Sequence, residues 1–441
     1  MIRKKDMGIW AFLPLFILVG AYIAVAIGNA ILGTRYSLPI LAVLMICTAI
    51  GLLMGPQKLD DKIDFFCKGA ADKGLILTIL IFMLAGCFSK VASATGAVDS
   101  TVYLVLQFVS PKFLYTGIFL ISAFLSLCIG TSVGTCTAMV PIAHGLCLST
   151  GLDINIAFAG VIAGAVFGDN LSMVSDTTIA ATKGVGAEMK DKFRMNFKIV
   201  LPAAIATAIV FAVIGMKSIT GGAIAVGEYN IVKIIPYLYV LVTAISGMNI
   251  FAVLASASAV SAIVGFLTNS LTFAGLLVAI SEGIMKMATV IIMAIFVKGI
   301  MGLIEAYGGI EWLTQKLTQN IKSKKGAQYS IGALSAIFTL AMNSTTMAII
   351  TAVPLGKDIG ERYGISPKRV ACLLDLFSTT AMGFLFWNGL YYIVQNLAGA
   401  GDIMGMFSHC YYFIFVMIST VISIQFDIFN DKKEKKQSVA P

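Results

Sequence analysis

The chain alternates between long apolar runs and short polar segments over its whole length. The runs lie near residues 10–28, 38–55, 74–94, 113–149, 155–182 and 197–216, and then near 231–248, 250–268, 283–306, 327–357, 369–396 and 405–426. A helix needs about 20 residues to cross a hydrocarbon core of about 30 Å, and each run is about that long or longer. The pattern predicts an all-α polytopic membrane protein with about 10 transmembrane helices.

Two of the runs are longer than one crossing requires and carry small polar residues at their middle. These residues are Gly130, Thr131, Ser132, Val133 and Gly134 in segment 113–149, and Asn343, Ser344, Thr345 and Thr346 in segment 327–357. Non-helical backbone at membrane depth occurs only where protein buries it or where it lines a cavity. We expect two re-entrant helical hairpins whose polar tips lie near the membrane centre. Full-length helix pairs joined by a short loop fit the pattern equally well.

The two halves of the chain look like internal copies. A shift of 213 residues places Pro141 on Pro354 (354 − 141 = 213), and several glycines match in the same way. Prolines and glycines at matched places in the hydropathy profile are what a structural repeat retains. We predict a first repeat at 1–216 with a broken helix near 155–182, a linker at 217–230, a second repeat at 231–428 with a broken helix near 369–396, and a charged cytoplasmic tail at 429–441.

The distribution of lysines indicates that the repeats have inverted topology. Segment 56–73 holds four lysines and its partner 269–286 holds one, whereas segment 95–112 holds one and its partner 308–325 holds four. Because cytoplasmic loops are enriched in Lys and Arg, equivalent loops must face opposite sides of the membrane. Basic residues near both ends of the chain place both termini in the cytoplasm.

Composition narrows the function classes. Hydrophobic residues make up 59% of the chain, charged residues only 12%, and the mean hydropathy is +0.93. The net charge of +9 comes from residues between the apolar runs, which is typical of membrane topology and not of nucleic-acid binding. The sequence has no nucleotide-binding glycine loop, no HExxH or GxSxG motif and no Cys/His constellation, so we predict neither an enzyme nor a cofactor.

Two carboxylates, Asp169 and Asp176, interrupt the apolar stretch 160–184. Charge in a hydrocarbon setting is costly unless it is paired or faces a polar cavity, so such residues suggest a functional site. In a continuous helix the two acids share one face about 10 Å apart along the axis, and unwinding at Ser172 brings them closer. Their oxygens suit either a hard cation such as Na⁺ or a proton. In the alternative, Asp169 caps a helix and Asp176 pairs with Lys183.

The segment around these acids also carries a family resemblance. GDNLSMVSDTT, residues 168–178, resembles the G-D-x-x-S-x-x-S-D-T-T signature of the NhaC family of Na⁺/H⁺ antiporters, and GTSVGTCTAMVPIA, residues 130–143, is similar to the companion segment of that family. The resemblance implies an ion-transporter-type fold with inverted repeats, and Asp169 and Asp176 as cation or proton ligands. Met173 and Val174 stand where we expect Ser-Pro. Relatives exchange organic acids or take up other solutes, so the resemblance leaves the substrate open.

We therefore predict a site to which both repeats contribute. The predicted cation and proton ligands are Asp169, Asp176, Ser172, Ser175, Thr177, Thr131 and Ser132, with Na⁺ held by Asp169 and Asp176. The predicted substrate contacts are Gly130, Gly134, Asn170, Asn343, Ser344, Thr345, Thr346, Asp375 and Asn388. Broken helices would free carbonyl oxygens for a small cation and direct helix N-termini at an anionic group. We expect the mixed charges of segment 188–194, including Lys192, to be solvated.

The function predicted from the sequence is secondary active transport, namely Na⁺/H⁺ antiport by alternating access. A Na⁺- or H⁺-coupled transporter of a small carboxylate or amino acid is the first alternative, and a passive channel is the second. The predicted partners are membrane lipid and a small ion or small organic solute, with no nucleic acid, and a homodimer is compatible with the sequence. We expect a multi-pass protein of the cell (inner) membrane.

Overall fold

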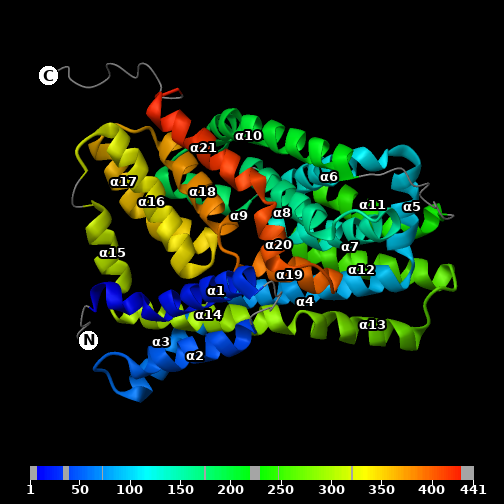
Figure 1. Cartoon of the computed structure of the whole chain (residues 1–441), viewed down its shortest axis with the longest axis horizontal. Helices are drawn as coiled ribbons and strands as arrows, with labels where there is room; N and C mark the ends of the chain where they lie inside the picture. The colour runs from blue at the N-terminus through cyan, green and yellow to red at the C-terminus, as the bar shows by residue number, and fades with distance from the viewer. Residues whose placement is uncertain are drawn as a thin grey trace.

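The computed structural model describes residues 7–32, 39–71, 73–172, 175–218, 229–246, 248–318 and 321–428, and this part of the chain is helical without strands (Figure 1). The first half contains η1 (Gly8–Phe12), α1 (Leu13–Leu32), α2 (Ile40–Leu53), α3 (Leu59–Ala70), α4 (Lys73–Ala94), α5 (Ala97–Phe108), η2 (Pro111–Phe113), α6 (Leu114–Ile129), α7 (Ser132–Thr150), α8 (Ile154–Leu171), α9 (Asp176–Val185) and α10 (Met189–Ser218). The second half contains α11 (Ile231–Ile245), α12 (Ile250–Leu267), α13 (Phe273–Lys286), α14 (Ala288–Ala306), α15 (Gly309–Thr318), α16 (Lys324–Met342), α17 (Thr345–Arg362), α18 (Pro367–Gly383), α19 (Gly389–Ala398), α20 (Ile403–Ser408) and α21 (Tyr411–Gln425).

Many of these helices can cross a membrane. Among the described residues, seven helical stretches have the length and hydropathy of a span, and the bent pair of α5 with η2 and α6 raises the number to eight. Three apolar helical stretches, Gly8–Leu18, Ile40–Leu53 and Ile231–Val240, are shorter than a straight crossing requires. The predicted fold class, an all-helical membrane protein of many spans, is confirmed. The predicted helix number and repeats stay predictions, and the tail at 429–441 and most of the linker lie outside the described residues.

The polar middle of each long apolar run forms a tight turn between two helices. Gly130 has a φ of 74° between α6 and α7, and Asn343 has a φ of 46° between α16 and α17. Both values lie in the left-handed region, which glycine and asparagine enter with little strain. Ser344 then caps α17, because its Oγ accepts a 3.4 Å hydrogen bond from the backbone N–H of Met347. Whether these helix pairs dip into the membrane or cross it stays a prediction.

The two runs that follow these turns are interrupted helices. In the first half, α8 ends at Leu171 and α9 begins at Asp176. In the second half, α18 ends at Gly383 and α19 begins at Gly389, with Asn388 as its cap. Ser172 follows α8 and Ser175 precedes α9, whereas α18 ends before apolar residues and only Asn388, before α19, accepts a bond from a freed backbone N–H group, that of Leu390.

The helix pairs of the two halves pack in a similar way. In the first half α6 packs along α8, and in the second half α16 packs along α18. Ser126 Oγ donates a hydrogen bond to the carbonyl oxygen of Ala165, and at the positions shifted by 213 residues (339 − 126 = 378 − 165 = 213) the hydroxyl oxygens of Thr339 and Ser378 lie 2.6 Å apart. The two contacts lie at matched places in the two predicted repeats, and the repeats stay a prediction.

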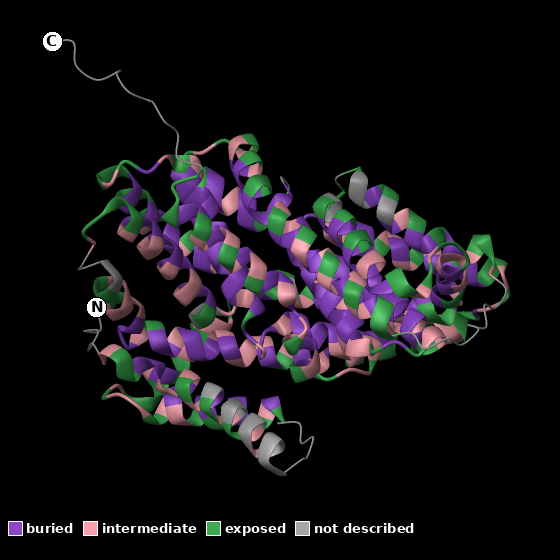
Figure 2. Cartoon of the chain, turned by 45° about the horizontal axis from the view of Figure 1, so that its top comes forward, coloured by how far each residue is buried: buried purple, intermediate pink, exposed green. Residues whose placement is uncertain are grey.

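A separate group of helices packs beside these pairs. The helix α4 packs against both α12 and α13, and α2, α3 and α14 contact one another; these helices lie along the lower side of Figure 1. A Cβ atom added at Gly86 would lie 2.1 Å from the carbonyl oxygen of Gly283, so these two glycines allow α4 and α13 to touch along their backbones. Figure 2 shows that buried residues concentrate toward the centre of the molecule.

Candidate functional site

A buried ion pair joins the two halves of the chain. Nζ of Lys192, in the first turns of α10, lies 2.7 Å from Oδ2 of Asp375, near the middle of α18. The side chains are 1% and 0% exposed, respectively. Removing two charges from water costs several kcal/mol per ion before their attraction is counted, so such a pair forms only with close geometry and further hydrogen bonds.

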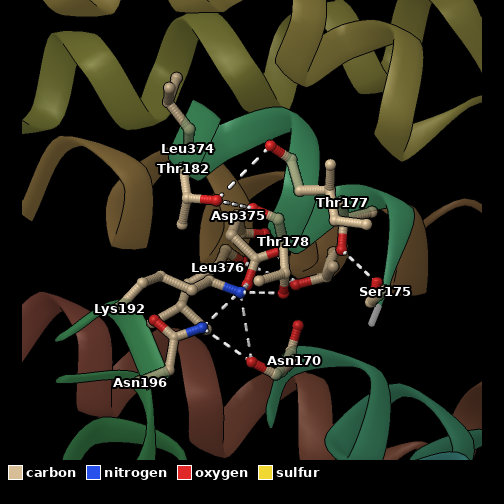
Figure 3. A network of polar contacts seen from close by, with 12 residues as sticks. Asn170, Ser175, Thr177, Thr178, Thr182, Lys192, Asn196, Leu374, Asp375 and Leu376 are labelled. Atoms are coloured by element: carbon tan, nitrogen blue, oxygen red, sulfur yellow. Dashed lines mark hydrogen bonds and ion pairs between the residues drawn. The ribbon is translucent and has the colours of Figure 1, made fainter. Parts of the chain in front are cut away.

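The ammonium group of Lys192 has two more acceptors (Figure 3). It donates a 2.6 Å hydrogen bond to Oγ1 of Thr178 in α9, and a 3.4 Å hydrogen bond to the carbonyl oxygen of Asn170 near the end of α8. Three oxygens from three helices therefore surround one ammonium nitrogen. The interruption between α8 and α9 makes this possible, because it separates Asn170 from Thr178 and lets both face α10.

Two asparagines extend the network around Asp375. Nδ2 of Asn196, one turn beyond Lys192 in α10, donates to Oδ2 of Asp375 at 2.8 Å and to the carbonyl oxygen of Asn170 at 2.9 Å. Nδ2 of Asn170 in turn donates to the hydroxyl group of Tyr412 in α21 at 3.0 Å. Both partners of Asn196 Nδ2 are pure acceptors, so its amide nitrogen must face them.

Asp169 lies next to this network. Ser132, the first residue of α7, donates a 3.0 Å hydrogen bond to Oδ2 of Asp169. The side chain of Asp169 is half-buried and close enough to Asp375 and Lys192 for their charges to interact. The two acids with one lysine thus carry a formal charge of −1 when all three are ionised.

Four buried oxygens of this region have no hydrogen-bond donor among the described residues. They are Oδ1 of Asp169, Asn170, Asn196 and Asp375. Ionised carboxylates and amide oxygens only accept hydrogen bonds, so a group that satisfies them must bring protons or positive charge. Carboxylate and amide oxygens are also the ligands that hard cations prefer. In chemical type these four oxygens therefore suit a small cation such as Na⁺.

The structure does not bring Asp176 into this network. Asp176 is the first residue of α9, and its side chain is exposed, whereas that of Asp169 is half-buried. The prediction that both acids lie on one face assumed a continuous helix. Since the chain leaves the helix after Leu171, that spacing no longer applies. An acid at the N-terminus of α9 instead interacts favourably with the dipole of that helix.

The other predicted residues of the first half surround the helix interruption. Ser172 and Ser175 are buried between α8 and α9, and the hydroxyl oxygens of Ser175 and Thr177 lie 2.9 Å apart. Thr131 precedes α7 without capping it through its side chain, and the glycines Gly130 and Gly134 are buried beside it. Together with Ser132, these residues lie at the ends of α7, α8 and α9.

The predicted residues of the second half are less concentrated. Asp375 lies in the network, but Asn388 is 1% exposed and caps α19 by accepting a 2.8 Å hydrogen bond from the N–H of Leu390. That bond gives Asn388 a structural role. Asn343, Ser344, Thr345 and Thr346 are half-buried at the turn between α16 and α17. Among the described residues, no hydrogen bond that we observe connects this turn directly with Lys192.

Sequence reasoning missed the residues of α10. The expectation that Lys192 is solvated is wrong, because α10 begins at Met189 and its first turns already pack against α8, α9 and α18. Asn196 is not among the residues predicted from the sequence. A signal was available: Lys192 and Asn196 are four residues apart, so in a helix they share one face at the start of a long apolar run. Arg369, which is 2% exposed and donates to Gln328 and Ser423, is a second buried cation that was not among the predicted site residues.

Several known transporters have sequences similar to this chain. The malate-2H⁺/Na⁺-lactate antiporter of Bacillus subtilis (strain 168) is 26% identical over 218 residues, which are 48% of this chain and 45% of that protein. The Na⁺/H⁺ antiporter NhaC of Alkalihalophilus pseudofirmus is 29% identical over 208 residues, 46% of this chain and 44% of that protein. The arginine/ornithine antiporter ArcD of Halobacterium salinarum is 21% identical over 421 residues, 86% of this chain and 84% of that protein.

The first two of these alignments cover less than half of each relative. The family comparison covers more of the chain. The model of the Na⁺/H⁺ antiporter family matches residues 6–216 and 214–385, which include α8, α9, α10 and α18 and therefore the whole Lys192–Asp375 network except Tyr412. This chain belongs to the Na⁺/H⁺ antiporter family.

Proposed function

We propose that the protein is a Na⁺/H⁺ antiporter in which Na⁺ and protons compete for Asp169, with Asp375 beside it. The observation that carries this proposal is the set of four buried oxygens without donors on Asp169, Asn170, Asn196 and Asp375. A carboxylate buried among apolar helices is unstable without compensation, so it takes up either a metal cation or a proton. If the carboxylate always holds either Na⁺ or a proton, the binding of one releases the other, and the site exchanges Na⁺ for a proton.

The position of Asp169 favours a cation. Asp169 and Asn170 lie in the last turn of α8, where the carbonyl groups at the end of a helix carry partial negative charge. Ser132 donates to one carboxylate oxygen, and the other has no donor among the residues that the structure describes. Na⁺ at this oxygen gains both the carboxylate charge and the dipole of α8.

The fold supports alternating access. Asp169 belongs to the first half of the chain, Asp375 belongs to the second, and α10 joins them through Lys192 and Asn196. A site that lies between two related halves opens to one side or the other when one half moves relative to its partner. The inverted repeats and the two hairpins predicted from the sequence are part of this proposal.

Transport in proteoliposomes tests the proposal. With a pH-sensitive dye inside the vesicles, we expect external Na⁺ to enter and drive protons out, so that the lumen becomes alkaline without any organic solute. Asp169→Asn removes the charge at nearly constant volume and should abolish this change. Lys190→Gln, at an exposed position of α10, is the matched control. Na⁺ gradients that move no protons through the wild-type protein would refute antiport.

A cation-coupled exchanger of a small carboxylate or amino acid is the second candidate. It is supported by the names of two relatives, the malate-2H⁺/Na⁺-lactate antiporter and the arginine/ornithine antiporter. In addition, the residues that precede α7 and α9, Thr131 and Ser175, do not cap these helices through their side chains, which leaves N–H groups for an anionic group. In the same vesicles, accumulation of a labelled lactate, malate or arginine against its gradient would identify this activity, and equilibration without accumulation would indicate a channel.

The protein is a multi-pass membrane protein of a transporter family. We place it in the cell (inner) membrane with both termini in the cytoplasm, and we include Na⁺ and H⁺ as the coupling ions without any further cofactor. Modification of single introduced cysteines by an impermeant reagent in intact cells tests the topology. Crosslinking in membranes tests the proposed homodimer.

A further inference from the structure

The surroundings of the Lys192 ammonium group resemble a ligand site more than a structural contact. Its three acceptors are a carboxylate oxygen at 2.7 Å, a hydroxyl oxygen at 2.6 Å and a carbonyl oxygen at 3.4 Å, contributed by α18, α9 and α8. A monovalent metal ion or a primary ammonium group takes the same three kinds of oxygen. All of them lie on helices that meet at the interruption after Leu171.

The position of Lys192 in its own helix is unfavourable. It is the fourth residue of α10, close to the end where the helix dipole is positive, and this disfavours a cation. A buried ion pair adds little net stability compared with an apolar pair of the same volume. The ammonium charge at this position is therefore stabilised by the oxygens around it and not by the helix that carries it.

Only one of the two carboxylate oxygens of Asp375 has partners among the described residues. Its Oδ2 accepts from both Lys192 and Asn196, whereas its Oδ1 is buried without a donor among the described residues. Within the described part of the chain, Oδ1 of Asp169 has no donor either, and the hydrogen bond to its carboxylate comes from Ser132 and not from an ammonium group. A cation that enters near the two acids therefore meets the open carboxylate oxygen of Asp169 and the carboxylate of Asp375, which Lys192 already occupies.

We propose that the oxygens of Asp375, Thr178 and Asn170 form a binding site for a monovalent cation or a primary ammonium group, and that Lys192 fills this site as a tethered ligand. The inference rests on the proposed function and extends it: the transported cation displaces the lysine, whose flexible four-carbon stem lets it withdraw. The lysine keeps the empty site neutral, and it lowers the apparent affinity of the protein for the entering cation.

Chemical replacement of the side chain tests this directly. Lys192→Ala removes three carbons and the ammonium group, which n-propylammonium restores. With purified full-length protein in detergent, choline chloride keeps the ionic strength constant while Na⁺-dependent thermal stabilisation reports Na⁺ binding. We expect Lys192→Ala to bind Na⁺ about tenfold more tightly than wild type if the lysine occupies the site nine-tenths of the time.

In the Lys192→Ala variant, n-propylammonium should raise the melting temperature and increase the Na⁺ concentration needed for half-saturation. In the wild-type protein n-propylammonium should change neither the melting temperature nor the Na⁺ half-saturation, because the lysine of the protein itself occupies the site. Uncharged n-propanol is the chemical control, and Lys190→Gln is the control for loss of a lysine from α10. If Lys192→Ala does not fold, Lys192→Gln keeps a polar side chain that is one atom shorter and uncharged, and it should also tighten Na⁺ binding.

Unchanged Na⁺ half-saturation in the variant that folds, or stabilisation by n-propylammonium without competition with Na⁺, would show a purely structural lysine and overturn the inference. Because these measurements report binding, they are independent of antiport. If n-propylammonium competes with Na⁺ but Na⁺ drives no proton movement, the ammonium site stands and the proposed antiport is rejected. If Na⁺ drives proton movement but n-propylammonium does not compete with Na⁺, only the ammonium site is rejected.

Discussion

The hydroxyl group of Ser132 donates a 3.0 Å hydrogen bond to Oδ2 of Asp169, and so connects the start of α7 to the last turn of α8. The other oxygen of the carboxylate, Oδ1, is buried without a donor among the described residues. The turn at Gly130 allows this contact, because it reverses the chain between α6 and α7 and brings Ser132 against α8. One oxygen of Asp169 is thus held in place and the other is available for a cation.

Ser132→Ala removes the hydrogen bond that orients Asp169. A hydrogen bond to a charged group contributes about 1.5–3 kcal/mol, so we expect the Na⁺ concentration for half-maximal proton movement to rise about tenfold or more. Ser132→Thr keeps the hydroxyl group and should remain close to wild type. Proton movement in proteoliposomes at a series of Na⁺ concentrations measures the effect. Equal values for Ser132→Ala and Ser132→Thr would mean that the hydroxyl group does not position the carboxylate.

Asp375→Asn leaves the charge of Lys192 buried without a counter-ion. Breaking a buried pair on one side costs about 3–5 kcal/mol, so the variant should unfold at a clearly lower temperature than wild type. The double variant Asp375→Asn with Lys192→Gln removes both charges and should recover most of the loss. Thermal unfolding in detergent compares the single and double variants. If the double variant loses the sum of the two single losses, the residues are not coupled.

An exposed ion pair provides the control for that experiment. Nη2 of Arg362 lies 2.9 Å from Oδ2 of Asp358, and the side chains are 71% and 54% exposed. Water screens such a pair, and its contribution is about 0–1 kcal/mol. Asp358→Asn should therefore change the unfolding temperature little under the same conditions.

Gly168→Ala should separate two helices at the site. A Cβ atom at Gly168 would lie 2.3 Å from the carbonyl oxygen of Ala123, so α6 and α8 must move apart. Such overpacking costs about 1–3 kcal/mol and also shifts Asp169, the next residue. Gly20→Ala in α1 has nothing within 4 Å of the added atom and serves as the control. Unfolding temperature and Na⁺ half-saturation should both worsen for Gly168→Ala alone.

Asp176→Asn should affect transport less than Asp169→Asn. Asp176 is exposed at the N-terminus of α9, where the loss of its charge costs about 0.3–1 kcal/mol of interaction with the helix dipole. We expect at most a several-fold change in Na⁺ half-saturation. Complete loss of proton movement with intact folding would return Asp176 to the cation site, as the sequence predicted.

The sequence by itself determined the features that depend on nearby residues. Apolar runs of membrane length predicted an all-helical membrane protein, because every backbone polar group in lipid must be bonded within its own segment. Small polar residues marked where helices end, and the structure has its turns at Gly130 and Asn343. Two acids in an apolar run, Asp169 and Asp176, marked the region of the site, because buried charge is costly wherever the chain folds.

Only the tertiary structure decided which charges meet. Asn196 and Asp375 are 179 residues apart, and their contact depends on how α10 packs against α18. The same reason explains the error for Lys192: the sequence shows a lysine in a charged segment, and packing against three other helices removes it from water. Asp176 is the opposite case, because the sequence predicted a residue of the buried site and the structure has an exposed side chain. The direction of α9 after the interruption follows from tertiary contacts and not from helical spacing.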